Sequence, residues 1–192
     1  MTDFEEIDSL KRGDERAFQL LLNTFSEKIY NLSFSILQNQ EDAEDITQEI
    51  FITVYLSISQ FKGDSKLSTW IYRITVNKCQ ELIRKRSRKK RFGFKTSIEN
   101  IDFEKPLSEN FTFMHPGIEL EKKERSMILF SAINQLPDNQ KIAFTMHKIE
   151  GISYEETAQI MNISLSSVES LMFRAKQNLK QLLGNYYEKN ER

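Results

Sequence analysis

Residues 61–91 have the sequence FKGDSKLSTWIYRITVNKCQELIRKRSRKKR, in which a short polar loop leads into an amphipathic helix. The Gly-Asp-Ser segment at 63–65 is typical of a turn, and the hydroxyl of Ser68 or Thr69 suits a helix N-cap. From position 67 the apolar and polar residues separate into two stripes at helical spacing. The apolar stripe consists of Leu67, Ile71, Ile74 and Leu82, with Trp70 and Thr75 at its margins. The opposite stripe consists of Arg73, Asn77, Gln80, Arg84 and Arg88.

This helix carries a large excess of positive charge. From Arg73 to Lys95 the chain has ten Lys or Arg residues and a single acid, Glu81. A basic run is also typical of a solvated surface or a tail, but here the basic groups continue the polar face of a helix that follows an aromatic and polar loop. Positive charge follows a phosphate backbone, and exposed aromatics and amides hold unstacked bases. The pattern therefore indicates a nucleic-acid surface.

The order of residues F-x-G-D-S-x-L-S-T-W-I-Y-R-I-T-V-N-K resembles the promoter-melting segment of the extracytoplasmic-function (ECF) sigma factors, a group of the sigma-70 family of bacterial RNA polymerase. In that family this helix and its preceding loop capture flipped bases of the minus-ten element. The resemblance implies that the following residues contact minus-ten DNA: Phe61, Lys62, Asp64, Ser65, Trp70, Arg73, Asn77, Arg84 and Arg88.

Length and composition set the frame for this interpretation. A chain of 192 residues fits one or two small domains. The formal net charge is −1, so acidic surfaces balance the basic helix and we expect weak binding to free DNA. Cys79 is the only cysteine, which excludes an internal disulfide and fits a reducing cytoplasm. No apolar run approaches the ~20 residues of a membrane span, and the acidic N-terminus lacks a signal-peptide pattern, so we expect a cytoplasmic protein without membrane insertion.

Two helices are expected before residue 61. The first starts near Asp14 after the Gly13 turn, and its core stripe consists of Phe18, Leu22, Phe25, Ile29, Leu32 and Ile36. The second starts at Asp42, and its inward face consists of Ala43, Ile46, Ile50 and Val54.

The other face of the second helix is acidic at one end and apolar at the other, and consists of Asp45, Gln48, Glu49, Ile52 and Leu56. A solvated acidic helix start or a helix buried on both sides would explain it. A nuclease metal site here lacks the second carboxylate or histidine cluster that it needs. The segment D-A-E-D-I-T-Q-E-I-F resembles the sigma-family segment that docks on the coiled coil of the largest polymerase subunit, which implies that role for this face.

The C-terminal part predicts another helical domain. Periodicity fails from about Ser87 to Gly117, a linker unusually rich in phenylalanine. A helix then carries Leu120, Met127, Phe130, Ile133 and Leu136, and another, from Asp138, carries Ile142, Phe144, Met146 and Ile149. His115 and His147 have no metal-ligand company, and we expect both to be structural or solvent-facing.

Residues 152–183 predict a helix-turn-helix, with a helix at 154–161, a turn at 162–163 and a second helix capped by Ser164. The second helix turns inward Leu165, Val168, Met172, Ala175 and Leu179, and outward Ser166, Ser167, Ser170, Phe173, Arg174 and Gln177, with Glu169 beside them. An ordinary helical hairpin has the same pattern. However, L-P-D-N-Q-K…E-G-I-S-Y-E-E-T-A-Q-I-M-N-I-S…V-E-S…R-A-K is similar to the sigma domain that binds the minus-thirty-five element. Family members often have basic residues where this chain has Glu169 and Leu171, so the usual phosphate contacts are not expected there.

The resemblance implies an all-α sigma factor with two helical domains joined by an irregular linker. These are a region 2 helical bundle at 1–90, the linker at 91–117 and a region 4 helix-turn-helix at 118–192. It implies no catalytic activity and no cofactor. The implied partners are core RNA polymerase (its coiled coil and flap region), promoter DNA, and an anti-sigma factor. The anti-sigma factor is expected to hold the chain in a compact state away from polymerase. A helix-turn-helix regulator that works without polymerase, or a metal-dependent nuclease, is the alternative.

Overall fold

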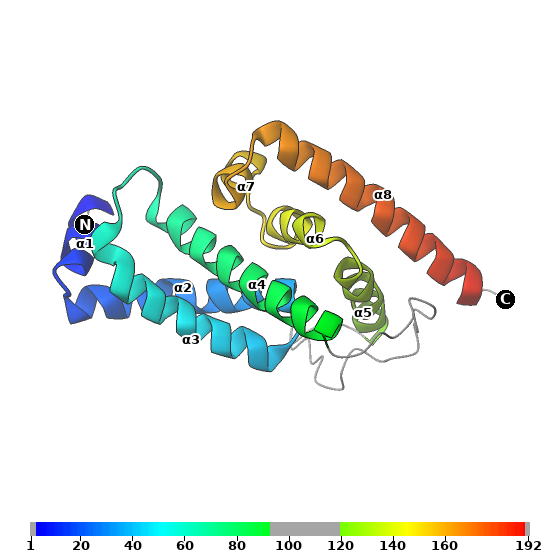
Figure 1. The fold of residues 1–192 in the computed structure, drawn as a ribbon, viewed down its shortest axis with the longest axis horizontal. Helices are drawn as coiled ribbons and strands as arrows, with labels where there is room; N and C mark the ends of the chain where they lie inside the picture. Colours follow the sequence, from blue (N-terminus) through cyan, green and yellow to red (C-terminus); the bar gives the residue numbers. More distant parts are fainter. Residues whose placement is uncertain (1–2, 93–119, 191–192) are drawn as a thin grey trace.

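The computed structural model describes residues 3–92 and 120–190, and every regular element in these ranges is a helix (Figure 1). The predicted all-α class is therefore confirmed. The N-terminal half contains α1 (Asp3–Lys11), α2 (Glu15–Leu37), α3 (Gln40–Ser57), the 3-10 turn η1 (Ile58–Gln60) and α4 (Leu67–Phe92). The C-terminal half contains α5 (Leu120–Asn134), α6 (Asp138–Phe144), the π-helical segment η2 (Thr145–Ile149), α7 (Tyr154–Met161) and α8 (Leu165–Asn190). Most of the predicted linker, with His115, lies outside the described residues.

Side-chain caps fix where α2 and α3 begin. Asp14 Oδ1 accepts hydrogen bonds from the N–H groups of residues 16 and 17 at 2.8 and 3.0 Å, which satisfies donors that the first helical turn leaves open. Asn39 Oδ1 accepts from the N–H of Asp42 at 2.9 Å. The predicted start near Asp14 is confirmed, while α3 begins at Gln40 rather than at Asp42.

The N-terminal core lies between α2, α3 and α4. On α3 the predicted inward face is buried, with none of its four residues more than 6% exposed. On α4 the buried side chains include Ile71, Thr75 and Cys79, whereas the predicted Leu67, Ile74 and Leu82 are only half-buried at the margin of this core. Gly63 adopts φ +80, which glycine tolerates without strain, and the predicted turn before α4 is present.

The helix-turn-helix is present as predicted. The turn passes through Asn162, whose backbone is left-handed with φ 55. Ser164 Oγ then accepts from the N–H of Ser167 at 3.2 Å, which caps α8. Val168 and Met172 on α8 pack against Ala143 and Ala158 in a small core.

The two halves pack against each other. Figure 1 shows α4 with α2 and α3 on one side and α6 and α7 on the other. Ile142, Met146 and Ile160 of the C-terminal half belong to the same buried cluster as Ile29 and Ile71 of the N-terminal half. The N-terminal core therefore extends into the C-terminal half, which also has buried clusters of its own.

Several sequence-based expectations are wrong in detail. A helix, α1, precedes the expected first helix, and α4 continues past Ser87 to Phe92. Because α4 begins at Leu67, Ser68 and Thr69 lie inside the helix and do not cap it. Three of the apolar residues given for the C-terminal helices are exposed, Met127 at 41%, Ile149 at 36% and Leu165 at 41%.

Candidate nucleic-acid and polymerase interfaces

The mixed face of α3 is open to solvent. Ile52 is 60% exposed and Leu56 is 70% exposed, beside the exposed Asp45, Gln48 and Glu49. The explanation that α3 is buried on both sides is therefore wrong. Contiguous exposed apolar side chains beside polar ones are typical of a protein-binding surface.

Sequence analysis missed one member of this face. Tyr55 is 55% exposed, three positions after Ile52 and one before Leu56. Its ring meets Phe18 of α2 edge-on, with 5.0 Å between centroids. Helical spacing from Ile52 would have found Tyr55, since residues three apart share a face.

Ion pairs connect this helix to α4. Lys78 Nζ lies 2.6 Å from Glu49 Oε1, and Arg86 pairs with Asp42. Exposed ion pairs of this kind contribute about 0–1 kcal/mol each. Their position matters because Glu49, on the predicted docking face, contacts Lys78, which is next to Asn77 on the predicted DNA face.

The loop before α4 is accessible only in part. Lys62 and Asp64 are exposed and Ser65 is half-buried. Phe61, however, is 4% exposed, and its ring packs on the half-buried Trp70 with 5.3 Å between centroids. Phe61 therefore anchors the loop to the core in this structure, and its contact with DNA stays a prediction.

The polar face of α4 is divided between solvent and protein. Asn77, Arg84 and Arg88 are exposed. Arg73 Nη2 donates to the backbone oxygen of Gln159 in α7 at 2.7 Å, and Gln80 Nε2 lies 3.4 Å from an oxygen in α6. The C-terminal half thus covers part of the predicted minus-ten surface.

The outward face of α8 is exposed to solvent, and the residues there are Ser166, Ser167, Glu169, Ser170, Phe173, Arg174 and Gln177. Phe173 is 62% exposed. Arg174 Nε donates to the backbone oxygen of Ser170 at 3.2 Å, which holds the guanidinium along the helix. Among the described residues, no ion pair joins Glu169 to Lys176 or Lys180.

The two predicted DNA faces line one hollow. A polar cavity of about 520 Å³ lies between α4 and the helix-turn-helix. From α4 it is lined by Gln80 and Arg84, and from α8 by Ser166, Ser170 and Arg174, among others. Both faces therefore point toward each other in this structure.

Within the described ranges, the remaining candidate residues form no metal site and no membrane span. No group of histidine, cysteine or acidic residues there could hold a metal ion, and none of the described helices is suited to crossing a membrane. His147 Nδ1 lies 2.9 Å from the backbone oxygen of Ile152, and its ring packs on Tyr154, a structural role. Burial raises the pKa of the Cys79 thiol to about 12, which keeps it unreactive.

Comparison with known proteins identifies both halves. Residues 21–89 match the family described as Sigma-70 region 2, and residues 126–179 match Sigma-70, region 4. The RNA polymerase sigma-H factor of Pseudomonas aeruginosa is 31% identical over 188 residues, which cover 94% of this chain and 93% of the relative. The ECF RNA polymerase sigma-E factor of Escherichia coli K12 is 32% identical over 179 residues, 92% of each chain. The chain is an ECF sigma factor of the sigma-70 family.

Solved structures agree on the fold. The sigma factor RpoE of Bartonella quintana, in complex with the anti-sigma factor NepR, matches with a TM-score of 0.65 and 23% identity, over 87% of this chain and 96% of that one. CnrH, in complex with the cytosolic domain of CnrY, matches with a TM-score of 0.67 and 20% identity, over 96% and 99%.

Membership of the family establishes the function. This sigma factor directs RNA polymerase to promoters, with region 2 binding the minus-ten element and region 4 the minus-thirty-five element. Sigma factors are non-catalytic transcription initiation factors. A helix-turn-helix regulator that works without polymerase would need no region 2, so the match at 21–89 argues against that alternative.

Proposed function

We propose that three surfaces, each made of named residues, carry out this function, and that they lie on two units of the chain. Residues 1–90 form the region 2 unit, residues 118–192 the region 4 unit, and residues 91–117 connect them. Both family matches fall inside these bounds, at 21–89 and 126–179.

The first surface docks on the coiled coil of the largest polymerase subunit. It consists of Asp45, Gln48, Glu49, Ile52 and Leu56. The exposure of Ile52 at 60% and Leu56 at 70% is the observation that carries this assignment, since no described side chain covers them. An apolar centre with charged neighbours is the composition expected of a protein interface.

The second surface holds the unstacked minus-ten strand. The exposed Asn77 offers an amide to a base edge, and Arg84 and Arg88 offer charge to the backbone. Lys62, Asp64 and Ser65 of the loop, together with Trp70 and Arg73, complete it, while the buried Phe61 supports the loop from below.

The third surface is the outward face of α8, which enters the major groove at the minus-thirty-five element. Its polar members are Ser166, Ser167, Glu169, Ser170, Arg174 and Gln177, and Phe173 adds an apolar contact. The family resemblance adds a contact between region 4 and the polymerase flap.

We also propose an anti-sigma factor as a partner and the cytoplasm as the place of action. The structurally similar RpoE and CnrH were each solved as complexes, with NepR and with the cytosolic domain of CnrY. A protein that docks on RNA polymerase must be in the same compartment as the polymerase, which is the cytoplasm.

Run-off transcription tests the assignment as a whole. Purified core polymerase would be combined with this chain and a template library randomised in both promoter elements. We expect transcripts that depend on the chain and that select a motif at each element. Chain-dependent binding of DNA without any transcript, and without co-purification with core, would contradict it.

A further inference from the structure

The cavity between α4 and the helix-turn-helix has the size of a small-molecule site. Its volume of about 520 Å³ falls within the roughly 300–1,000 Å³ that such sites typically occupy. Helix α4 contributes Gln80 and Arg84 to its wall, and α6 contributes Asn139. Gln80 Nε2 lies 3.4 Å from Asn139 Oδ1, so a hydrogen bond joins the walls that come from the two halves of the chain.

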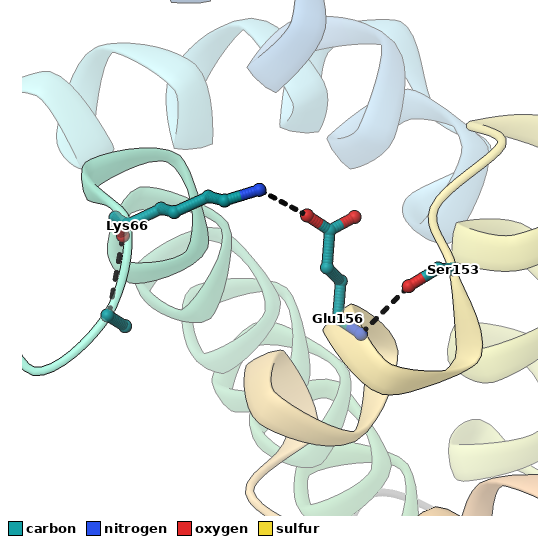
Figure 2. A network of polar contacts seen from close by, with 4 residues as sticks. Lys66, Ser153 and Glu156 are labelled. Carbon is teal, nitrogen blue, oxygen red and sulfur yellow. Dashed lines mark hydrogen bonds and ion pairs between the residues drawn. The ribbon is translucent and has the colours of Figure 1, made fainter.

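Two basic side chains elsewhere at the contact between the halves are bound to protein atoms. In Figure 2 the side chain of Lys66 reaches toward Glu156, with 3.3 Å between Nζ and Oε1. The N–H of Glu156 donates to Ser153 Oγ at 3.1 Å, so the cap of α7 holds this residue in place. Arg73 Nη2 donates to the backbone oxygen of Gln159 at 2.7 Å. These two cations are therefore engaged within the protein.

The two guanidinium groups of the cavity lack such acidic partners. Arg84 of α4 and Arg174 of α8 both line it, and among the described residues neither forms an ion pair. None of the described side chains that line the cavity is acidic. Like charges at one cavity repel each other, and a bound anion would offset that repulsion. Because a guanidinium fork matches phosphate with paired hydrogen bonds, the cavity suits a phosphate group.

Hydroxyl groups on the α8 side of the cavity add further donors. Ser166, Ser167 and Ser170 line it, and all three are exposed. The first two lie in the first turn of α8, with their Oγ atoms 3.0 and 2.8 Å from Ser164 Oγ. A hydroxyl can turn its hydrogen toward a phosphate oxygen. Arg174 Nε donates to the backbone oxygen of Ser170 at 3.2 Å, which leaves the two terminal nitrogens of that guanidinium for a ligand.

Part of the cavity wall is apolar. Met161, Ile163 and Leu171, in and around the turn of the helix-turn-helix, line the cavity and are each half-buried. An inorganic phosphate ion would leave this surface in contact with water, whereas an organic phosphate would cover it with its apolar part. The two kinds of wall therefore indicate a ligand with a phosphate end and an apolar or aromatic end.

We propose that this cavity is a binding site for a small organic phosphate of the size of a nucleoside diphosphate. Arg84 and Arg174 hold the phosphate groups from opposite halves of the chain, and Met161, Ile163 and Leu171 contact the base. The ligand and promoter phosphates would compete for the two guanidinium groups. That consequence rests on the proposed function, whereas the site itself does not.

Isothermal titration calorimetry of the full-length chain tests the site with ADP, adenosine and pyrophosphate as probes. We expect ADP to bind most tightly and adenosine not to bind measurably, since adenosine carries no charge. Pyrophosphate should bind more weakly than ADP because it leaves the apolar wall uncovered. No binding of ADP at millimolar concentration, or binding no tighter than that of adenosine, would overturn the proposal. Equal binding of pyrophosphate and ADP would overturn the role of the apolar wall.

Two substitutions, each with a matched control, locate the binding. Arg84→Gln and Arg174→Gln each remove one guanidinium from the cavity, while Arg88→Gln and Lys176→Gln remove exposed positive charges of the same helices that do not line it. Loss of a charge-assisted hydrogen bond should weaken ADP binding about tenfold or more in the first pair. The controls should change it by less than about twofold. Equal losses in all four variants would mean that ADP follows surface charge alone, which would overturn the proposal.

The melting temperature gives an independent readout, because a ligand that binds only the folded chain stabilises it by mass action. ADP should raise the melting temperature of the wild type and of both controls, but not that of the double variant Arg84→Gln/Arg174→Gln. An equal rise in the double variant would place ADP elsewhere on the chain and overturn the proposal. Neither DNA nor polymerase enters these measurements, so their failure would leave the proposed function of the two regions untouched.

Discussion

Glu49 takes part in two surfaces at once. Its carboxylate accepts a hydrogen bond from Lys78 on α4 at 2.6 Å, while its side chain remains 54% exposed on the proposed docking face. Glu49→Lys would present a positive charge to polymerase in place of a negative one. It would also place the new ammonium group next to that of Lys78. We expect weaker co-purification with core polymerase and an unchanged far-ultraviolet circular dichroism spectrum. Glu27→Lys, an exposed position on α2, is the control, and unchanged affinity in Glu49→Lys would remove this helix from the interface.

Glu169 is a candidate for base discrimination. It is exposed beside the outward face of α8 and forms no ion pair with its lysine neighbours in the described part of the chain. A carboxylate accepts from the exocyclic amine of cytosine, and a matched pair discriminates by roughly 1–3 kcal/mol. Glu169→Gln should therefore relax preference at one promoter position, and Glu169→Lys should raise affinity for all sequences.

Base preference is measured by selecting promoters from a library randomised in the minus-thirty-five element, with holoenzyme containing each variant. Arg174→Ala serves as the comparison, because loss of a phosphate contact weakens every sequence about equally. An unchanged selected motif in Glu169→Gln would mean that the residue reads no base.

Glu150 makes the stability of the folded chain depend on pH. Burial raises the pKa of its carboxyl above the ordinary value of 4.5, and the hydrogen bond from Ser35 opposes this only in part. A raised pKa means that the folded state favours the protonated form, so this contribution to stability is complete below pH 4.5 and is lost as pH rises through the raised pKa. The nearby Tyr72 hydroxyl, whose pKa burial also raises, stays neutral throughout.

Glu150→Gln keeps an acceptor for Ser35 but carries no charge at any pH. We expect its thermal stability to lose this pH dependence, so that the variant gains on the wild type as pH rises from about 4.5 to neutral. Parallel melting-temperature curves for the two proteins would contradict the expectation.

At the scale of an element, α4 combines a buried stripe with the face proposed to bind the minus-ten strand. Asn77 is exposed midway along that face, and a base held there typically contributes ~1–3 kcal/mol. Asn77→Ala should reduce promoter opening, measured by permanganate reactivity, more than it reduces closed-complex binding. Lys85→Ala, which removes an exposed basic side chain from the same helix, is the control and should reduce promoter opening and closed-complex binding to a similar degree. Equal losses in Asn77→Ala would indicate that α4 only contacts duplex backbone.

Local signals explain which elements sequence analysis predicted correctly. The caps at Asp14 and Ser164 and the left-handed turn at Asn162 depend on neighbouring residues, so the starts of α2 and α8 were predictable. Non-local contacts were not. The bond from Arg73 to Gln159 spans 86 positions, and nothing in either segment alone predicts it.

Burial is the feature of the candidate site that the sequence does not predict. The family resemblance implies that Phe61 contacts DNA, whereas in this structure its ring completes the core against Trp70. An aromatic residue at the end of a core-facing helix satisfies either role, and only packing decides. The exposed members of the docking face on α3 were predictable because helical spacing separates them from Ile46 and Ile50.

At the scale of the whole molecule, two features predict that the isolated chain binds promoter duplex weakly. The formal net charge is −1, so little long-range attraction draws DNA to the protein. The two proposed DNA faces also line a common cavity, and in this arrangement they cannot reach separated elements together. We therefore expect little sequence-specific retardation of a promoter duplex by the chain alone at about 0.15 M salt, and stable retardation once core polymerase is added. Only the binding seen with core polymerase should depend steeply on salt concentration, because many phosphate contacts form in that complex. Tight, sequence-specific binding by the chain alone would show that region 2 and region 4 separate without polymerase.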